Sequence, residues 1–302
     1  MSPAHSPDGA RMNDDLGKLE AAVDRALATG DASHLEVVGY GEITLVVRWT
    51  VDGRQVACKR LPGLAGDAAF SAYRSCVTSY IARLAERGVV VPETTVEAVP
   101  RRDGTVTAYC VQAVLATTSL LPRHLQGAGR GEVREVAAAL VERIAGCIDS
   151  RLGLDAQLSN WAWTDGGLRY LDISTPFERD DRGRESFDVE LHLASVPWAL
   201  RGAVRRFALG AILDKYYDRR GALLDLAGNL HKERLAQLLP DVLEAANRVV
   251  EPPITAEEAE RYYRDDARMW ELLQRLRRAD RWWQRTVRRR RYPFLLPGSI
   301  ER

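Results

Sequence analysis

Two short stretches of the sequence contain residues that could hold a phosphate group. Gly39 and Gly41 flank a tyrosine between two runs of β-forming residues. Glycines in such a turn let backbone N–H groups approach an anion closely, although ordinary turns contain them too. Lys59 lies within the apolar run VACKRL. An inward-pointing lysine there is costly unless an anion or a carboxylate meets it, whereas an outward-pointing one is simply solvated.

A third stretch contains oxygen ligands that suit a metal ion. Asp155 and Asn160 have the spacing D-x-x-x-x-N, and Asp172 comes at the end of the next hairpin. Carboxylate and amide oxygens are the ligands that Mg²⁺ prefers in proteins. Taken singly, Asp155 could cap a turn and Asp172 could end a strand. Because all three residues flank one predicted hairpin, the sequence places them close together.

A sheet has to position the first two stretches. Alternation of apolar and polar residues predicts five strands, at 34–40, 42–51, 54–61, 95–99 and 105–115. Asp52-Gly53 predicts a tight turn, and 67–87 has the apolar spacing of an amphipathic helix. Because successive strand residues point to opposite faces, Lys59 and Arg60 should diverge. We expect one of them to face a cleft and the other to face solvent.

The whole chain is predicted to have four segments and an α+β fold. Residues 1–13, rich in Pro, Ser, Gly and Asp, predict a disordered tail, and a helix follows at 14–33. The strands and the amphipathic helix then form a small unit at 34–115. Residues 116–302 are mainly helical and contain the loop 152–160 and the hairpin 160–174.

The order of these features resembles the protein-kinase-like superfamily. The glycine turn, the strand lysine, one helix, two more strands and then D-x-x-x-x-N with a later Asp occur in that family's order over roughly residues 35–175. The resemblance implies a two-lobe fold with a small antiparallel sheet lobe and a helical lobe. It also implies ATP and Mg²⁺ as cofactors, and a nucleotide and a hydroxyl-bearing acceptor as partners.

The resemblance implies a role for each matched residue. Lys59 would pair with the α- and β-phosphates, beneath a loop that contains Gly39 and Gly41. The segment 112–115 would contact adenine, mainly through backbone groups.

The resemblance also implies which residues carry out the reaction. Asp155 would be the catalytic base or would orient the acceptor hydroxyl, and Asn160 and Asp172 would coordinate Mg²⁺. The implied activity is transfer of phosphate from ATP to a hydroxyl of a small molecule or a peptide.

Departures from the protein-kinase pattern favour a small-molecule branch. The third glycine of the loop is replaced by Thr44, and Ile173-Ser174 stands where protein kinases have Phe-Gly. No His-Arg precedes Asp155, and no long activation segment with Ala-Pro-Glu follows. In these respects the chain is similar to the aminoglycoside and choline kinase-like phosphotransferases.

The helix at 67–87 supports an alternative function. Active kinases place a glutamate in its middle as the partner of the strand lysine. Here the only acids of the helix are Asp67 at its start and Glu86 at its end. A catalytically inactive pseudokinase that binds a nucleotide or a protein partner is therefore the second hypothesis.

An arginine-rich stretch suggests a third hypothesis. Residues 275–291 contain nine arginines, one aspartate and the pair Trp282-Trp283. Aromatic residues among cations can stack on nucleic-acid bases, but such a helix can equally pack its tryptophans on the protein and leave its arginines in water. A nucleic-acid-associated protein is the less favoured interpretation.

Composition limits the class of protein. The 302 residues have a net charge of +1, which indicates neither a nucleic-acid binder nor a membrane-surface protein as a whole, although local runs can differ. The four cysteines form no C-x-x-C pair, and no apolar run is long enough to span a bilayer. We therefore expect a cytoplasmic protein with reduced thiols.

Overall fold

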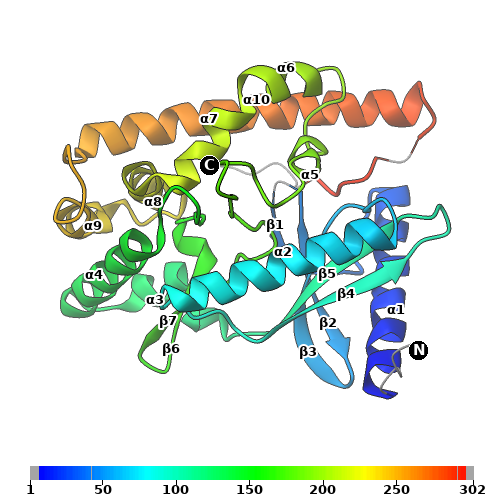
Figure 1. Cartoon of the computed structure of the whole chain (residues 1–302), viewed down its shortest axis with the longest axis horizontal. Coiled ribbons are helices and arrows are strands. Elements are labelled where there is room, and N and C mark those ends of the chain that lie inside the picture. The colour runs from blue at the N-terminus through cyan, green and yellow to red at the C-terminus, as the bar shows by residue number, and fades with distance from the viewer. Residues whose placement is uncertain (1–6, 42, 291, 297–302) are drawn as a thin grey trace.

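The computed structural model describes residues 7–41, 43–290 and 292–296 and is an α+β protein (Figure 1). Its larger sheet has five antiparallel strands in the spatial order β1-β2-β3-β5-β4. The strands are β1 (Glu36–Tyr40), β2 (Leu45–Val51), β3 (Arg54–Arg60), β4 (Thr94–Pro100) and β5 (Val106–Ala113). Asp52 and Gly53 both have positive φ, as a tight hairpin turn requires. The predicted α+β class and the predicted strands are thus confirmed, with ends shifted by a few residues.

Two helices cover opposite faces of this sheet (Figure 1). Helix α1 (Pro7–Thr29) packs Leu16, Leu19 and Val23 against one face. Helix α2 (Asp67–Glu86) packs on the other face, where the core continues into the helical part of the chain. Residues that alternate along a strand therefore belong to two separate cores.

Helix α1 begins earlier than the sequence suggested. Residues 7–13 are helical and continuous with the rest of α1, so the expected tail is corrected over these residues. The remainder of that tail, residues 1–6, lies outside the described residues.

The rest of the chain is mainly helical, as predicted. A short hairpin, β6 (Trp161–Thr164) and β7 (Gly167–Tyr170), interrupts it. The helices are α3 (Leu121–Gly127), α4 (Arg130–Cys147), α5 (Glu190–Leu193), α6 (Arg201–Phe207), α7 (Leu209–Asp214), α8 (Arg219–Lys232), α9 (Leu239–Ala246) and α10 (Ala256–Thr286). In Figure 1, α10 lies along the upper edge and passes over both the helical part and the sheet. No helix among the residues placed by the structure is long and apolar enough to cross a membrane.

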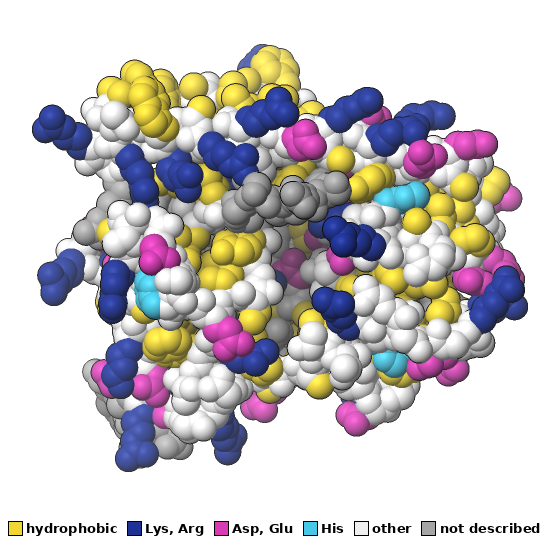
Figure 2. Space-filling model, turned by 180° about the vertical axis from the view of Figure 1, so that it is seen from behind, with side chains coloured by type: hydrophobic (Ala, Val, Ile, Leu, Met, Phe, Trp, Pro, Cys, Tyr) yellow, Lys and Arg dark blue, Asp and Glu magenta, His cyan; other side chains and the backbone are white. Residues whose placement is uncertain are grey.

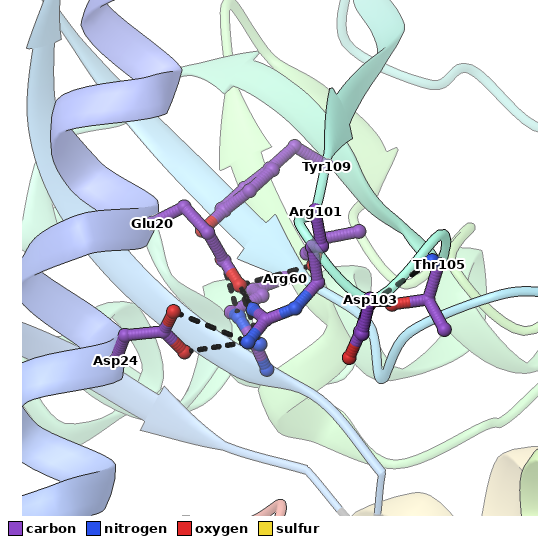
Figure 3. A network of polar contacts seen from close by, with 8 residues as sticks. Glu20, Asp24, Arg60, Arg101, Asp103, Thr105 and Tyr109 are labelled. Atoms are coloured by element: carbon purple, nitrogen blue, oxygen red, sulfur yellow. Dashed lines mark hydrogen bonds and ion pairs between the residues drawn. The ribbon is translucent and has the colours of Figure 1, made fainter. Parts of the chain in front are cut away.

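A buried ion-pair network fastens α1 to the sheet (Figure 3). Arg60 is buried and gives two hydrogen bonds to Glu20, of 2.7 and 2.8 Å. Glu20 also accepts from Arg101, Thr107 and Tyr109. Burial alone would raise the pKa of Glu20, but its cationic and hydroxyl partners outweigh that effect and lower the pKa to about 2. The expectation that one of Lys59 and Arg60 faces solvent is therefore wrong, because α1 covers the second face.

Helix α2 is fastened mainly to the helical part of the chain. Five side chains of α2 and its C-terminal end, spaced three or four residues apart, donate hydrogen bonds to it, and we call this row the α2 seam. The pairs are Tyr73–Ser174, Cys76–Ser186, Tyr80–Gly153, Arg83–Glu178 and Arg87–Asp149. Residues at this spacing share one side of a helix, so the seam is continuous.

Candidate functional site

Lys59 meets a carboxylate from the far part of the chain. Its Nζ lies 2.7 Å from Oδ1 of Asp172, which follows strand β7. The two residues are 113 positions apart, and about one fifth of each side chain is exposed, 19% and 21%. The ion pair thus joins the sheet to the hairpin loop and is partly exposed.

The strand register places Gly39 in the same row as Lys59. Gly39 pairs with Val46, and Val46 pairs with Lys59. Directly opposed residues of antiparallel strands point to the same face. Gly39 therefore lies two strands, or about 10 Å, from Lys59 on the same face of the sheet, and a Cβ built there would touch only the Val46 side chain.

Gly41 belongs to the tight turn that follows β1. Its N–H donates to the carbonyl oxygen of Thr44 at 2.9 Å, and a Cβ at Gly41 would collide with the Thr44 hydroxyl. The glycine is therefore required by the turn itself. Position 42 lies outside the described residues. The structure places Gly39 on the face of Lys59, whereas Gly41 lines a small cavity together with Arg60 and Arg277, so it does not bring both glycines to the lysine.

Asp172 is held as an anion. Ser174 Oγ donates to its Oδ1 at 3.1 Å, in addition to Lys59. Burial would raise the pKa of Asp172, but the positive charge of Lys59 and the hydrogen bonds outweigh it, and the pKa is lowered. The ionised carboxylate of Asp172 can serve as an oxygen ligand for a cation that is also bound to a phosphate.

Asp155 lies in the loop before β6 and has the opposite tendency. Burial raises its pKa to about 7, and the negative charges of Asp225 and Asp172 add to this effect. Its Oδ1 accepts from the backbone N–H of Gln157 at 3.1 Å, and its own N–H donates to the Tyr170 hydroxyl. Asp155 is therefore a carboxyl group that can take up or release a proton near neutral pH.

Asn160 lies at the other end of the same loop. Its Nδ2 is 3.4 Å from the carbonyl oxygen of Asp155, a long hydrogen bond that uses the amide nitrogen. The amide oxygen is thus the atom that Asn160 would offer to a cation. Together with Asp172 this gives one amide and one carboxylate oxygen, a sparse donor set that suits Mg²⁺ bound also by phosphate and water.

A self-sufficient metal centre is not found among the residues that the structure describes: no three His, Cys, Asp or Glu side chains converge there.

Tyr73 is a site residue that the sequence search overlooked. Its hydroxyl donates to the carbonyl oxygen of Ser174 at 2.9 Å and contacts Sγ of Cys110 at 3.2 Å. Cys110 is the cross-strand neighbour of Lys59. A neutral phenol thus lies on the α2 face turned toward the strand that contains Lys59 and toward the loop that contains Asp172. The position on the buried side of an amphipathic helix was visible in the sequence, but its role was not.

Asp225 of α8 is a second overlooked residue. It is buried, and its Oδ1 contacts the Tyr262 hydroxyl at 2.5 Å and Lys215 Nζ at 3.2 Å. Burial would lower the pKa of Lys215, but Tyr216 and Asp225 outweigh it and the pKa is raised. Asp155 therefore has a negative group, Asp225, and a positive group, Lys215, in its surroundings: the first raises its pKa and the second lowers it. No motif marks either residue, because they come from separate helical segments.

The segment expected to contact adenine begins at the end of β5. Gln112 donates from Nε2 to Thr94 Oγ1 at 3.0 Å, which ties β5 to the edge strand β4. The chain then leaves the sheet after Ala113 and enters the helical part. The segment 112–115 therefore joins the two parts of the molecule.

A pocket of about 990 Å³ lies elsewhere, on the α1 face of the sheet. Lys18, Arg54 and Gln112 are among its lining residues, and neither Lys59, Asp155 nor Asp172 lines it. The pocket lies behind the sheet and away from the convergent charged groups, so we place the candidate site at the Lys59–Asp172 pair.

Comparison with known proteins gives a family without an assigned activity. No curated protein matches the chain. A model described as a family of unknown function, DUF6206, matches residues 18–281, a range that includes Glu20, Lys59 and Asp172. Since this match covers most of the sequence, the chain belongs to the DUF6206 family.

Proposed function

We propose that this protein is an ATP- and Mg²⁺-dependent phosphotransferase with a protein-kinase-like two-lobe fold, acting on a hydroxyl of a small molecule. The observation that carries the proposal is the 2.7 Å pair between Lys59 and Asp172. Lys59 comes from the end of strand β3, and Asp172 comes from the loop after β7 in the helical part of the chain. A phosphate and its cation would be held where these two residues meet. The five-stranded antiparallel sheet with one helix between its third and fourth strands supports the proposed fold.

Each residue of the chain has a distinct role in this proposal. Lys59 binds phosphate oxygens, and Asp172 and Asn160 hold the cation through one carboxylate and one amide oxygen. The bound Mg²⁺-nucleotide supplies the phosphoryl group. Asp155 in its ionised form accepts a hydrogen bond from the acceptor hydroxyl and takes its proton. Its raised pKa of about 7 matches a base that works near neutral pH.

Binding of the nucleotide is the first test. We expect Mg²⁺-ATP to raise the melting temperature of the wild type by mass action, and Lys59→Met and Asp172→Asn to abolish that rise. Lys18→Met is the matched control, because Lys18 is an exposed lysine that lines the pocket behind the sheet. If Lys18→Met and not Lys59→Met removes the shift, the nucleotide binds behind the sheet and the proposed site is wrong.

Phosphate transfer is the second test. With radiolabelled ATP we expect slow hydrolysis or transfer that disappears in Asp155→Asn, while Mg²⁺-ATP still raises the melting temperature of that variant. The two readouts separate binding from chemistry, because Asp155 contacts the acceptor rather than the nucleotide in the proposal.

A pseudokinase is the second candidate, and Tyr73 is the observation that favours it. A neutral hydroxyl cannot neutralise Lys59 as a glutamate would, and Lys59 pairs directly with Asp172. A pseudokinase would still bind the nucleotide, and Lys59→Met would still abolish the rise in melting temperature. Asp155→Asn, however, would leave the rate of ATP hydrolysis unchanged.

A further inference from the structure

Helix α10 has a row of largely exposed apolar side chains. Met269, Leu272, Leu276, Ala279 and Trp283 are separated by three, four, three and four residues. This spacing places them on one side of the helix. Met269 is 65% exposed, Leu272 52% and Trp283 41%; Ala279 is also exposed, and Leu276 in the middle of the row is half-buried. We call these five residues the α10 stripe.

The α10 stripe is separate from the face that holds α10 on the protein. That other face buries Ala259, Gln274, Arg277 and Asp280 and packs closely against α8. An amphipathic helix needs one apolar face to dock on its own domain. A second apolar row that stays in water over several turns is costly and points to a second surface that covers it.

The C-terminal half of α10 is also strongly cationic. Between Leu272 and Arg290 the sequence has one acidic residue, Asp280, and it is buried. The exposed arginines of the same stretch are Arg275, Arg278, Arg288, Arg289 and Arg290. Arg275 is weakly paired with Glu271 at 3.7 Å, and both side chains are largely in solvent. The exposed charge beside the stripe is therefore positive.

Figure 2 shows hydrophobic and Lys or Arg side chains together along the left part of the upper edge of the molecule, with Asp or Glu side chains among the basic ones toward the right; in Figure 1 the upper edge is formed by α10 and α6.

We propose that the C-terminal half of α10 docks the protein on an anionic membrane surface. The stripe would enter the interfacial region of the lipid, and the arginines would contact lipid phosphates. Met269 and Leu272 gain from hydrocarbon and offer no ring on which a base can stack. Trp283, the aromatic member of the stripe, and its exposed neighbour Trp282 suit the headgroup level of a bilayer, where tryptophan is enriched, although their rings could also stack on a base. Docking of a second copy on the same row would bring two arginine-rich surfaces together. The charge and the side-chain types thus favour lipid over both alternatives.

Vesicle binding tests this proposal independently of any phosphotransferase activity. The full-length protein is sedimented with vesicles of phosphatidylcholine alone, or of phosphatidylcholine and phosphatidylglycerol in equal amounts. We expect binding to the anionic vesicles, weakening as salt is added, and much less binding to the neutral ones.

Two double variants separate the apolar from the charged contribution. Leu272→Ser with Trp283→Ser removes the centre of the stripe, and Arg275→Glu with Arg278→Glu reverses the charge beside it. Each pair is expected to weaken vesicle binding by at least about tenfold, given the contribution of each apolar or basic side chain at a membrane surface. All four residues lie on the outside of α10, so the variants should fold, which circular dichroism will verify.

Matched controls lie on other segments than α10. Val90 is 48% exposed before β4, and Arg102 is exposed in the β4–β5 turn. Val90→Ser and Arg102→Glu are expected to bind vesicles as the wild type does.

Three outcomes would overturn the proposal. Absence of binding to anionic vesicles rejects it outright. Binding of a single-stranded oligonucleotide that only the arginine variant loses, without vesicle binding, assigns the surface to nucleic acid. Self-association that only the Leu272 and Trp283 variant loses, again without vesicle binding, assigns it to a second copy of the chain.

Discussion

Lys59 and Arg60 are neighbours on one strand, and each pairs with a carboxylate on its own face of the sheet. The Arg60–Glu20 pair is almost fully buried, with 9% and 6% of the side chains exposed, whereas Lys59 and Asp172 keep about one fifth. Glu20 accepts hydrogen bonds from four different side chains, and Asp172 from two. The Arg60–Glu20 pair therefore has no hydrogen-bonding capacity left for a ligand, whereas the Lys59–Asp172 pair does.

This difference distinguishes a charged group that stabilises the fold from one that can bind a ligand. A buried carboxylate that is fully satisfied within the protein fixes the packing of two elements, here α1 and the sheet. A carboxylate that is partly satisfied and accessible can exchange a protein partner for a cation or a phosphate-bound group. The same contrast should appear in stability, pH dependence and ligand binding.

The largest effect is expected for Glu20→Gln. The substitution leaves the buried guanidinium of Arg60 without its counter-charge, so the free energy of unfolding should fall by about 3–5 kcal/mol. Urea denaturation followed by tryptophan fluorescence measures it. Asp24→Asn is the control, because Asp24 contacts Arg101 while remaining one third exposed, and it should cost far less. Equal losses in the two variants would contradict a structural role specific to Glu20.

The pH dependence of Glu20 has a defined sign. Its pKa of about 2 in the folded protein lies below the ordinary 4.5, so its stabilising contribution is present above pH 4.5 and is lost as the pH falls toward 2. The difference in stability between the wild type and Glu20→Gln should shrink over that window.

Asp155→Asn should have a smaller effect of opposite sign. The folded pKa of about 7 lies above the ordinary 3.8, so the charged carboxylate destabilises the wild type as the pH rises from about 4 through 7. The variant avoids this cost, and we expect it to gain on the order of 2 kcal/mol above pH 7 and nothing below pH 4. Urea denaturation at a series of pH values measures the difference. A variant that is less stable than the wild type at pH 8 would show that Asp155 is a structural residue.

Lys59→Met should cost less stability than Glu20→Gln. Both members of its pair retain contact with solvent, so we expect a loss of about 1–2 kcal/mol. The pKa of Asp172, now lowered, should rise once the ammonium group is absent, and nuclear magnetic resonance of a carboxyl-labelled sample can follow it. A loss as large as that of Glu20→Gln would remove the distinction between the two pairs.

Tyr73→Phe should have the smallest effect. It removes one hydrogen bond to the Ser174 carbonyl oxygen and keeps the ring, so the expected loss is about 1 kcal/mol. A decrease in Mg²⁺-ATP affinity in this variant, measured by calorimetry, would show that the α2 seam also supports the candidate site. Thr78→Val is the control, because Thr78 bonds only within α2.

The sequence predicted the sheet well because its strands are short, alternate cleanly and are separated by strong turn signals such as Asp52-Gly53. It also selected Lys59 and Asp172, since a lysine in an apolar strand and an acid at a hairpin end are locally unusual. Their contact could be anticipated only through the family resemblance, because 113 residues separate them.

The residues that were missed depend on tertiary contacts. One of Lys59 and Arg60 was expected to face solvent, because nothing in β3 itself indicates that α1 covers the second face of the sheet. A signal existed in α1, where Glu20 lies beside Leu16, Leu19 and Val23 on the apolar side. Asp225 had no such signal, because its partners come from separate helical segments.

The α2 seam determines which parts of the molecule would move together. By sequence, α2 belongs to the sheet unit, but its donors anchor it to residues 149–186 at every turn. If the molecule opens, the sheet should therefore swing away from α2, and α2 should stay with the helical part. The sliding surface would then lie between β5 and α2, where Tyr73 and Cys110 meet, so opening would change the surroundings of Lys59 first.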